Sequence, residues 1–157
     1  MVGKHFLLIG LAAGALGASA CGGGPATPGA PALVFEGPAA QTMSSASGSL
    51  QIAVWWSPSQ PTVGYDATQL AITDAGGAPV PGLDLTVIPW MPAHGHGTSV
   101  QPTVTETAPG VYVATPLDFF MAGTWELRSS IAGGASDSGA GDTAAVADTF
   151  VPMVNVP

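Results

Sequence analysis

Glycine and proline recur so often along this chain that long helices are not expected. From Ser49 onward, the longest stretch without either residue is 65–75, about the length of one ordinary helix. Within the uninterrupted stretches, apolar residues alternate with polar ones, most clearly over residues 50–56 and 124–131. A period of two is typical of half-buried strands. The sequence therefore predicts an all-β fold.

The turn-forming residues divide the body of the chain into short strands. Seven strands are predicted, at residues 50–56, 68–73, 83–90, 100–106, 111–115, 124–131 and 144–151. Pro109 followed by Gly110 suits a type II turn between two of them. Seven short strands with frequent turns favour an immunoglobulin-like antiparallel β-sandwich. Residues 133–142 are predicted to form a loop, in which Asp137 and Asp142 lack the ligand spacing of a calcium loop.

The amino-terminal segment carries an export signal. Residues 1–20 contain Lys4, then an apolar run, then small residues ending at Ala20, the order found in secretory signal peptides. Cys21 is the only cysteine, and its position after small residues resembles the lipobox of bacterial lipoproteins, although Ala18 stands where a lipobox usually has leucine. The resemblance implies lipidation of Cys21 and anchoring to a membrane; the alternative is ordinary cleavage that leaves a free thiol. We expect an exported protein of the cell envelope.

The segment after Cys21 differs in composition from the rest. Residues 21–47 consist mainly of glycine, proline, alanine, serine and other small or polar residues. Such a segment buries too little apolar area to offset its ordering entropy, so it is predicted to be a flexible tether. Residues 48–157 then form the single β-sandwich domain.

The charge distribution excludes some functions. The chain has ten acidic and two basic residues, and beyond the leader only Arg128 is basic. A surface of this kind repels nucleic acid phosphates and attracts cations. The chain also lacks a serine, histidine and acid set at recognisable spacing, a phosphate-binding glycine loop and a cysteine nucleophile within the domain. We therefore expect neither nucleic acid binding nor an enzyme.

Residues 90–97 carry the clearest chemical feature of the domain. His94 and His96 are the only histidines outside the leader, Met91 precedes them closely, and Met121 lies on a separate segment. Imidazole is a ligand for copper and zinc, and thioethers are soft ligands that select Cu(I). Two imidazoles and two thioethers therefore favour a copper site.

The predicted strand at residues 83–90 indicates how this site is built. Its alternation continues to Met91, which is expected to point inward at the strand end. His94 and His96 are two apart, so they would share a face if the segment is extended, and Trp90 and Trp125 would flank the ligands and shield the ion from water.

Other interpretations of these residues stay open. A zinc site would need a carboxylate such as Asp118 or Glu106 as a further ligand. The two histidines could instead be solvated or bonded to backbone carbonyls that hold a turn. Methionine and tryptophan are also common in cores, without any metal.

The same region carries a family resemblance. Residues 91–97, 109–112 and 120–127 resemble, in this order, segments of the YtkA-like family, relatives of FixH, and the likeness covers about residues 49–150. The resemblance implies a small extracytoplasmic β-sandwich, often tethered to a membrane and linked to copper handling and to assembly of haem-copper oxidases. This chain departs from FixH in having a signal peptide and a lipid-anchor cysteine in place of a transmembrane helix.

These observations lead to one expectation and two alternatives. We expect a membrane-tethered domain that binds copper, preferably Cu(I), as a carrier or buffer in the cell envelope. The first alternative is a metal-free module that binds another envelope protein and in which the His-Gly-His loop is a structural corner. The second is a sensor or accessory domain for a transporter.

Overall fold

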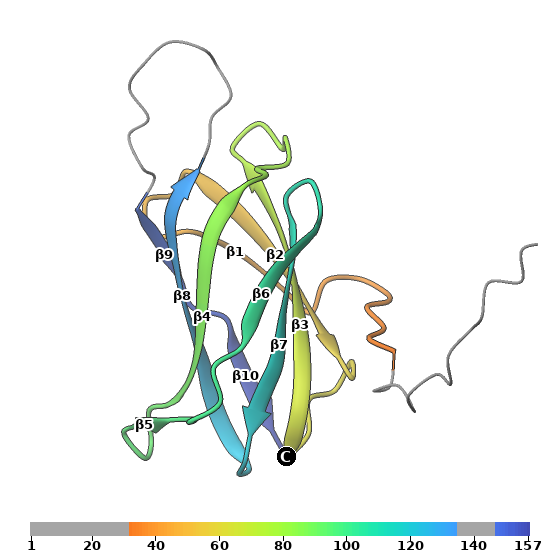
Figure 1. The fold of residues 1–157 in the computed structure, drawn as a ribbon, viewed down its shortest axis with the longest axis vertical. Helices are drawn as coiled ribbons and strands as arrows, with labels where there is room; N and C mark the ends of the chain where they lie inside the picture. Colours follow the sequence, from red (N-terminus) through yellow and green to blue (C-terminus); the bar gives the residue numbers. More distant parts are fainter. Residues whose placement is uncertain (1–31, 135–146) are drawn as a thin grey trace, which may run out of the picture. The chain divides into compact units, whose positions relative to one another are not determined.

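The computed structural model describes residues 32–134 and 147–157, which belong to one folded unit (Figure 1). The strands are β1 Gln41–Ser44, β2 Leu50–Ser57, β3 Gly64–Asp74, β4 Leu83–Met91, β5 His96–Gly97, β6 Thr103–Ala108, β7 Val111–Phe119, β8 Gly123–Gly134, β9 Asp148–Phe150 and β10 Met153–Val156. No helix occurs in these two ranges, and so none that is long and apolar enough to cross a membrane. The predicted leader, Cys21 and residues 22–31 lie outside the described residues, as do Asp137, Asp142 and the start of the last predicted strand.

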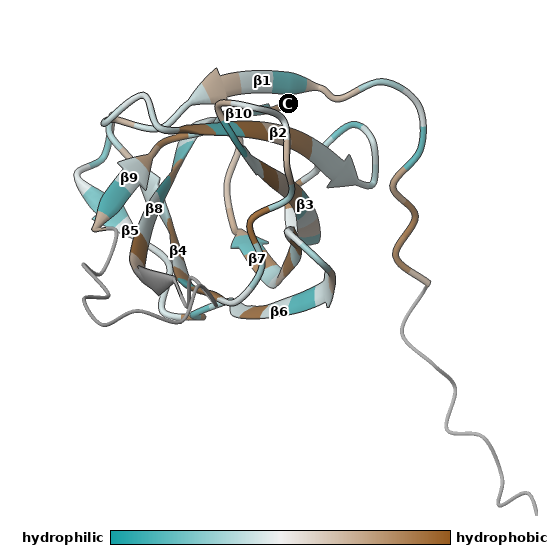
Figure 2. Cartoon of the chain, turned by 90° about the horizontal axis from the view of Figure 1, so that it is seen from above, coloured by the Kyte–Doolittle hydropathy of each residue, from teal (hydrophilic) through white to brown (hydrophobic). Residues whose placement is uncertain are grey.

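The strands form two antiparallel sheets. One sheet has the order β1-β2-β3-β7-β6, and the other has the order β10-β8-β4-β5, with β9 also paired to β8. Figure 2 shows the two sheets enclosing a common interior. The predicted all-β sandwich is confirmed, and each of the seven predicted strand positions carries a strand. The three additional strands, β1, β5 and β10, are short.

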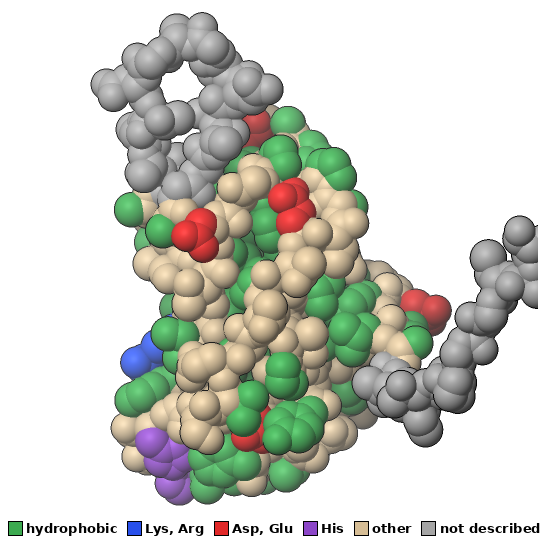
Figure 3. All heavy atoms as spheres, viewed as in Figure 1, with side chains coloured by type: hydrophobic (Ala, Val, Ile, Leu, Met, Phe, Trp, Pro, Cys, Tyr) green, Lys and Arg blue, Asp and Glu red, His purple; other side chains and the backbone are tan. Residues whose placement is uncertain are grey.

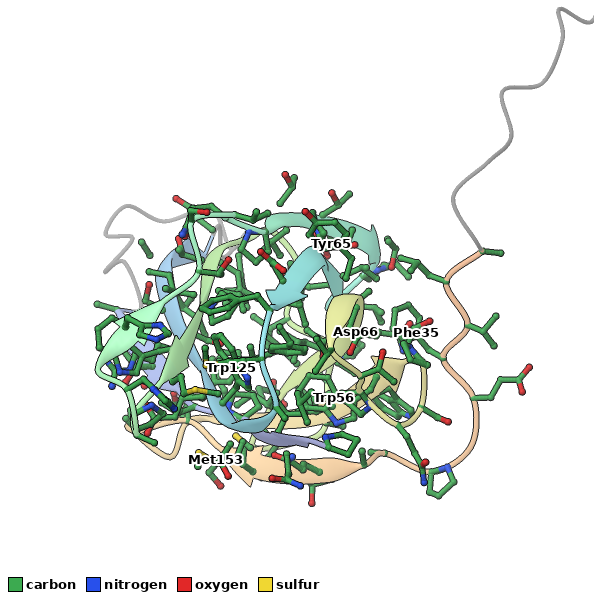
Figure 4. All side chains as sticks on the ribbon, turned by 90° about the horizontal axis from the view of Figure 1, so that it is seen from below. Phe35, Trp56, Tyr65, Asp66, Trp125 and Met153 are labelled. Atoms are coloured by element: carbon green, nitrogen blue, oxygen red, sulfur yellow. The ribbon has the colours of Figure 1, made fainter. Side chains whose placement is uncertain are left out.

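The core lies between the two sheets because apolar side chains alternate along the strands. Every second residue of β2 from Leu50 is buried, and the same holds for β8 from Trp125 to Ile131. Figure 4 shows Trp56 and Trp125 between the sheets, and both belong to one hydrophobic cluster. Burying a large apolar side chain contributes about 1.5–3 kcal/mol. The period-two pattern therefore specifies both the strands and the face that each strand buries.

The folded unit begins earlier than predicted. Strand β1 pairs with residues 51–54 of β2, and the Gln41 side chain forms hydrogen bonds with both the N–H and the C=O of Met153 on β10. Just before β1, the carbonyl of Gly37 accepts a hydrogen bond from the Trp55 indole. The flexible tether predicted over residues 21–47 is therefore wrong for residues 41–44. A polar segment gains order here by pairing its backbone with the free edge of β2.

The buried carboxylate of Asp148 connects the turn after β1 to β9 through hydrogen bonds. Asp148 accepts hydrogen bonds from the backbone N–H and the hydroxyl of Ser47 and from the N–H of Thr149. Burial raises the pKa of Asp148, but these bonds and a bond from the Ser45 hydroxyl lower it by more, so the pKa lies well below its usual range. The ionised carboxylate thus stabilises the connection between the two ends of the folded unit.

Candidate metal centre

The two histidines lie on a tight hairpin at the end of β4. The carbonyl of Met91 accepts hydrogen bonds from the N–H groups of His94 and Gly95, at 3.2 and 3.0 Å. Gly95 has a φ of 68°, a conformation that glycine adopts at little cost. Residues 92–95 therefore form a turn and not an extended segment, so the two imidazoles do not share a face through strand alternation. The turn nevertheless brings the imidazoles together, with ring centres 5.6 Å apart.

Strand pairing determines which side chains share a face of the hairpin. Met91 pairs with His96, and Trp90 pairs with Gly97. Directly opposed residues of antiparallel strands point to the same side, so His96 lies on the same face as Met91. The Met91 side chain is only 1% exposed, which confirms that it points inward. His96 is partly buried at the end of the interior.

The two predicted flanking tryptophans lie on opposite faces of the sheet. Trp125 is fully buried in the core. Trp90 points to the outer face, where the guanidinium of Arg128 lies 4.4 Å from its ring centre and forms an ion pair with Glu126. Of these two tryptophans, only Trp125 therefore lies on the inner face with Met91. Trp90 contacts the hairpin at Gly97 from the outer face.

Gly97 allows β5 to lie close against β4. A Cβ atom at this position would be 2.7 Å from the carbonyl oxygen of Pro89 and 3.4 Å from the Trp90 ring. A backbone carbonyl in a strand cannot move away easily, so only glycine fits without a shift. This close contact fixes the position of His96, the preceding residue.

Phe120 connects the histidines to the core, and the sequence did not indicate it. Its ring stacks on His96 with centres 5.5 Å apart, and it meets Trp125 edge-on at 5.3 Å. Phe120 is 43% exposed, whereas Phe119 before it is fully buried. An aromatic series therefore runs from His94 at the surface to Trp125 in the interior. The paired phenylalanines beside Met121 were the available signal, but their contact with a distant loop depends on the fold.

Both candidate methionines belong to segments at this end of the sandwich. The methyl carbon of Met91 lies against Gly123, 3.0 Å from where a Cβ atom would be. Met121 lies in the turn from β7 to β8; its carbonyl accepts the indole N–H of Trp125 at 3.0 Å, and its side chain packs against the core. The rings of His94 and His96 are thus neighbours, and Met91 lies opposite His96 on the paired strand. Met121 is held at this end of the sandwich by the hydrogen bond from the Trp125 indole to its carbonyl.

The carboxylates considered for zinc lie in different places. Asp118 accepts a hydrogen bond from the Thr98 hydroxyl at 3.1 Å and lines a hollow next to His96. Glu106 accepts hydrogen bonds from the N–H groups of Gly82 and Gly110, near the start of β4. Within residues 32–134 and 147–157, no three histidine, cysteine or acidic side chains gather as a metal-binding group. Of the two carboxylates, only Asp118 lies near His96.

Comparison with known proteins agrees with the resemblance seen in the sequence. The family model described as YtkA-like matches residues 44–130, which is more than half of the chain and includes the whole histidine hairpin. Neither the curated proteins nor the solved structures give a match. The chain therefore belongs to the YtkA-like family.

Proposed function

We propose that this protein binds one copper ion, preferably Cu(I), through His94 and His96 together with Met91 and Met121. The separation of the two imidazole rings, 5.6 Å between centres, is the observation that carries the proposal. With a metal–nitrogen bond of about 2.0 Å, and about 1.2 Å from nitrogen to ring centre, two imidazoles on one ion at 110–120° have centres about 5–5.5 Å apart. The hairpin thus holds the two rings near the spacing of a chelate.

The neighbouring side chains support copper over harder ions. Met91 lies on the same face of the hairpin as His96 and would reach the ion from the interior. Met121 lies in the adjoining turn, next to the phenylalanine that stacks on His96. Thioether sulfur selects Cu(I), whereas Mg²⁺ and Ca²⁺ need oxygen ligands. Phe120 and Trp125 would limit the access of water to the bound ion.

The predicted export signal and the charge support a role in the cell envelope. A leader ending at Ala20 would direct export, and a lipidated Cys21 would then anchor the domain to a membrane of the cell envelope. The net charge of −8 favours the approach of cations. We propose that the protein acts there as a carrier or buffer of copper.

A competition titration tests the binding step. Protein beginning at Ala32, which keeps β1, would be titrated with Cu(I) against a chelator, with tryptophan emission as a second signal because Trp125 lies near the site. We expect one equivalent to bind, and His94→Ala with His96→Ala to abolish the binding. The matched control is Thr86→Ala with Ser130→Ala, an exposed pair on the outer face of the same sheet. Equal affinity in the histidine and control variants would refute the proposal.

A second candidate function is a metal-free module that binds another envelope protein. Two exposed aromatic side chains support it, Phe120 beside the histidines and Tyr65, which is 70% exposed and pairs with Asp118. In this case the hydrogen-bonded turn at residues 92–95 is a structural corner. A stoichiometric protein complex that persists in the presence of a copper chelator and survives loss of both histidines would favour this function.

A further inference from the structure

A hollow lies next to the histidine hairpin. It is lined by His96, Gly97, Ser99, Asp118 and Phe120, so the hairpin forms one side and the end of β7 with the following residue forms the other. Figure 3 shows the two histidines and, in the same part of the surface, hydrophobic side chains and an acidic side chain. The lining therefore combines an aromatic ring, a hydroxyl group and a carboxylate.

The carboxylate in this hollow is held in a fixed orientation. The buried Thr98 hydroxyl donates to Asp118 Oδ2 at 3.1 Å, and it accepts the N–H of Val100 at 3.1 Å. No hydrogen bond from the described residues reaches Asp118 Oδ1. On the neighbouring strand, the exposed Tyr65 pairs with Asp118 and extends the aromatic surface beside it. One carboxylate oxygen thus remains available for a ligand.

The charge of this hollow is not balanced from within the described part of the chain. Arg128 is the only lysine or arginine side chain in residues 32–134 and 147–157, and it is held on the outer face of the other sheet by Glu126 and Trp90. The whole chain carries a net charge of −8. A ligand of this hollow should therefore be a cation that can also lie against an aromatic ring.

We propose that the hollow receives an arginine side chain of a partner protein, with the guanidinium bound to Asp118 and its flat face against Phe120. A planar guanidinium binds carboxylates through directed N–H donors and stacks on aromatic rings, which the compact ammonium group of lysine does less well. The partner is thus a protein with a basic surface. Docking here would place that surface next to His94 and His96, where the proposed copper ion would bind. Only this link to copper rests on the proposed function, and the arginine site itself does not.

The experiment uses short peptides as probes of the hollow. The ¹⁵N-labelled protein from Ala32 onward, kept metal-free with a chelator, would be titrated with blocked Gly-Arg-Gly, Gly-Lys-Gly and Gly-citrulline-Gly peptides and followed by NMR. We expect the arginine peptide to bind weakly, with a dissociation constant on the order of tens of millimolar, the range that one exposed ion pair together with a cation–π contact allows, and to shift the NMR signals of Ser99, Asp118 and Phe120. The lysine peptide should bind more weakly than the arginine peptide, and the citrulline peptide, which lacks the charge, at least about tenfold more weakly.

Two variants with equal charge separate the hollow from the general negative surface. Asp118→Asn keeps an acceptor for Thr98 and should weaken arginine binding about fivefold or more, whereas Asp84→Asn, at an exposed position of β4, should change it less than about twofold. Equal losses in both variants, shifts spread over all acidic residues, or binding of citrulline as strong as that of arginine would overturn the inference. Because the titration is metal-free, its failure is distinguishable from failure of copper binding.

Discussion

Gly97→Ala is the substitution that should disturb the histidine hairpin most selectively. The new Cβ would lie 2.7 Å from the carbonyl oxygen of Pro89, whereas carbon–oxygen contacts are normally about 3.3–3.6 Å. β5 must therefore move by about half an ångström or more. Overpacking of this kind costs about 1–3 kcal/mol, and alanine recovers about 0.4–1 kcal/mol by restricting the unfolded chain. With both terms near the middle of their ranges, the net loss should be about 1–2 kcal/mol.

Thermal unfolding and copper titration measure this effect together. The melting temperature should fall by about 3–10 °C for a domain of this size, and Cu(I) affinity should fall as well because His96 moves with β5. Gly76→Ala is the matched control: its φ is not in the left-handed region, and its Cβ would meet only a side-chain oxygen of Asp74 at 3.3 Å. If Gly97→Ala and Gly76→Ala have equal stability and equal copper affinity, the reasoning about close packing at β5 is wrong.

Three further predictions concern single side chains. Phe120→Ala should weaken Cu(I) binding about two- to tenfold in a competition titration, because an aromatic pair contributes about 0.5–1.5 kcal/mol; unchanged affinity would show that stacking does not position His96. Met121→Leu should weaken Cu(I) binding more than Cu(II) binding, while Met153→Leu, at an exposed position of β10, should change neither; equal effects of the two variants would exclude Met121 as a ligand. Because hydrogen bonds lower the folded-state pKa of Asp148, the stability it contributes is present above its unfolded-state pKa of about 3.9 and is lost as the pH falls below that value. Melting temperature should thus fall more steeply in acid for the wild type than for Asp148→Asn, and parallel curves would contradict this.

The sequence predicts the core of this fold well because strand alternation is a local property. The buried face of β2 and the inward direction of Met91 both follow from a period of two. Strand β1 could not be predicted in the same way. Its residues are mostly polar, and its order comes from pairing with the edge of β2 and from the contacts of Gln41 with β10, which no local pattern contains.

In the candidate site too, features of neighbouring residues could be predicted from the sequence, whereas contacts between distant residues could not. The rings of His94 and His96 lie 5.6 Å apart between centres because of a turn in which Gly95 has a positive φ, and the sequence did not indicate this turn. The stacking of Phe120 on His96 joins residues far apart in sequence. The position of Trp90 on the outer face follows from its pairing with Gly97, which requires the hairpin to be known first.

X-ray absorption spectroscopy of the Cu(I)-loaded protein tests the central proposal most directly. The ligand set His94, His96, Met91 and Met121 predicts nitrogen neighbours at about 2.0 Å and sulfur neighbours at about 2.3 Å. The sulfur signal should decrease in Met121→Leu, and the double histidine variant should retain no copper at this site and so give no such spectrum. A copper spectrum with no sulfur neighbours, or one that is unchanged without the two histidines, would contradict a copper site at this hairpin.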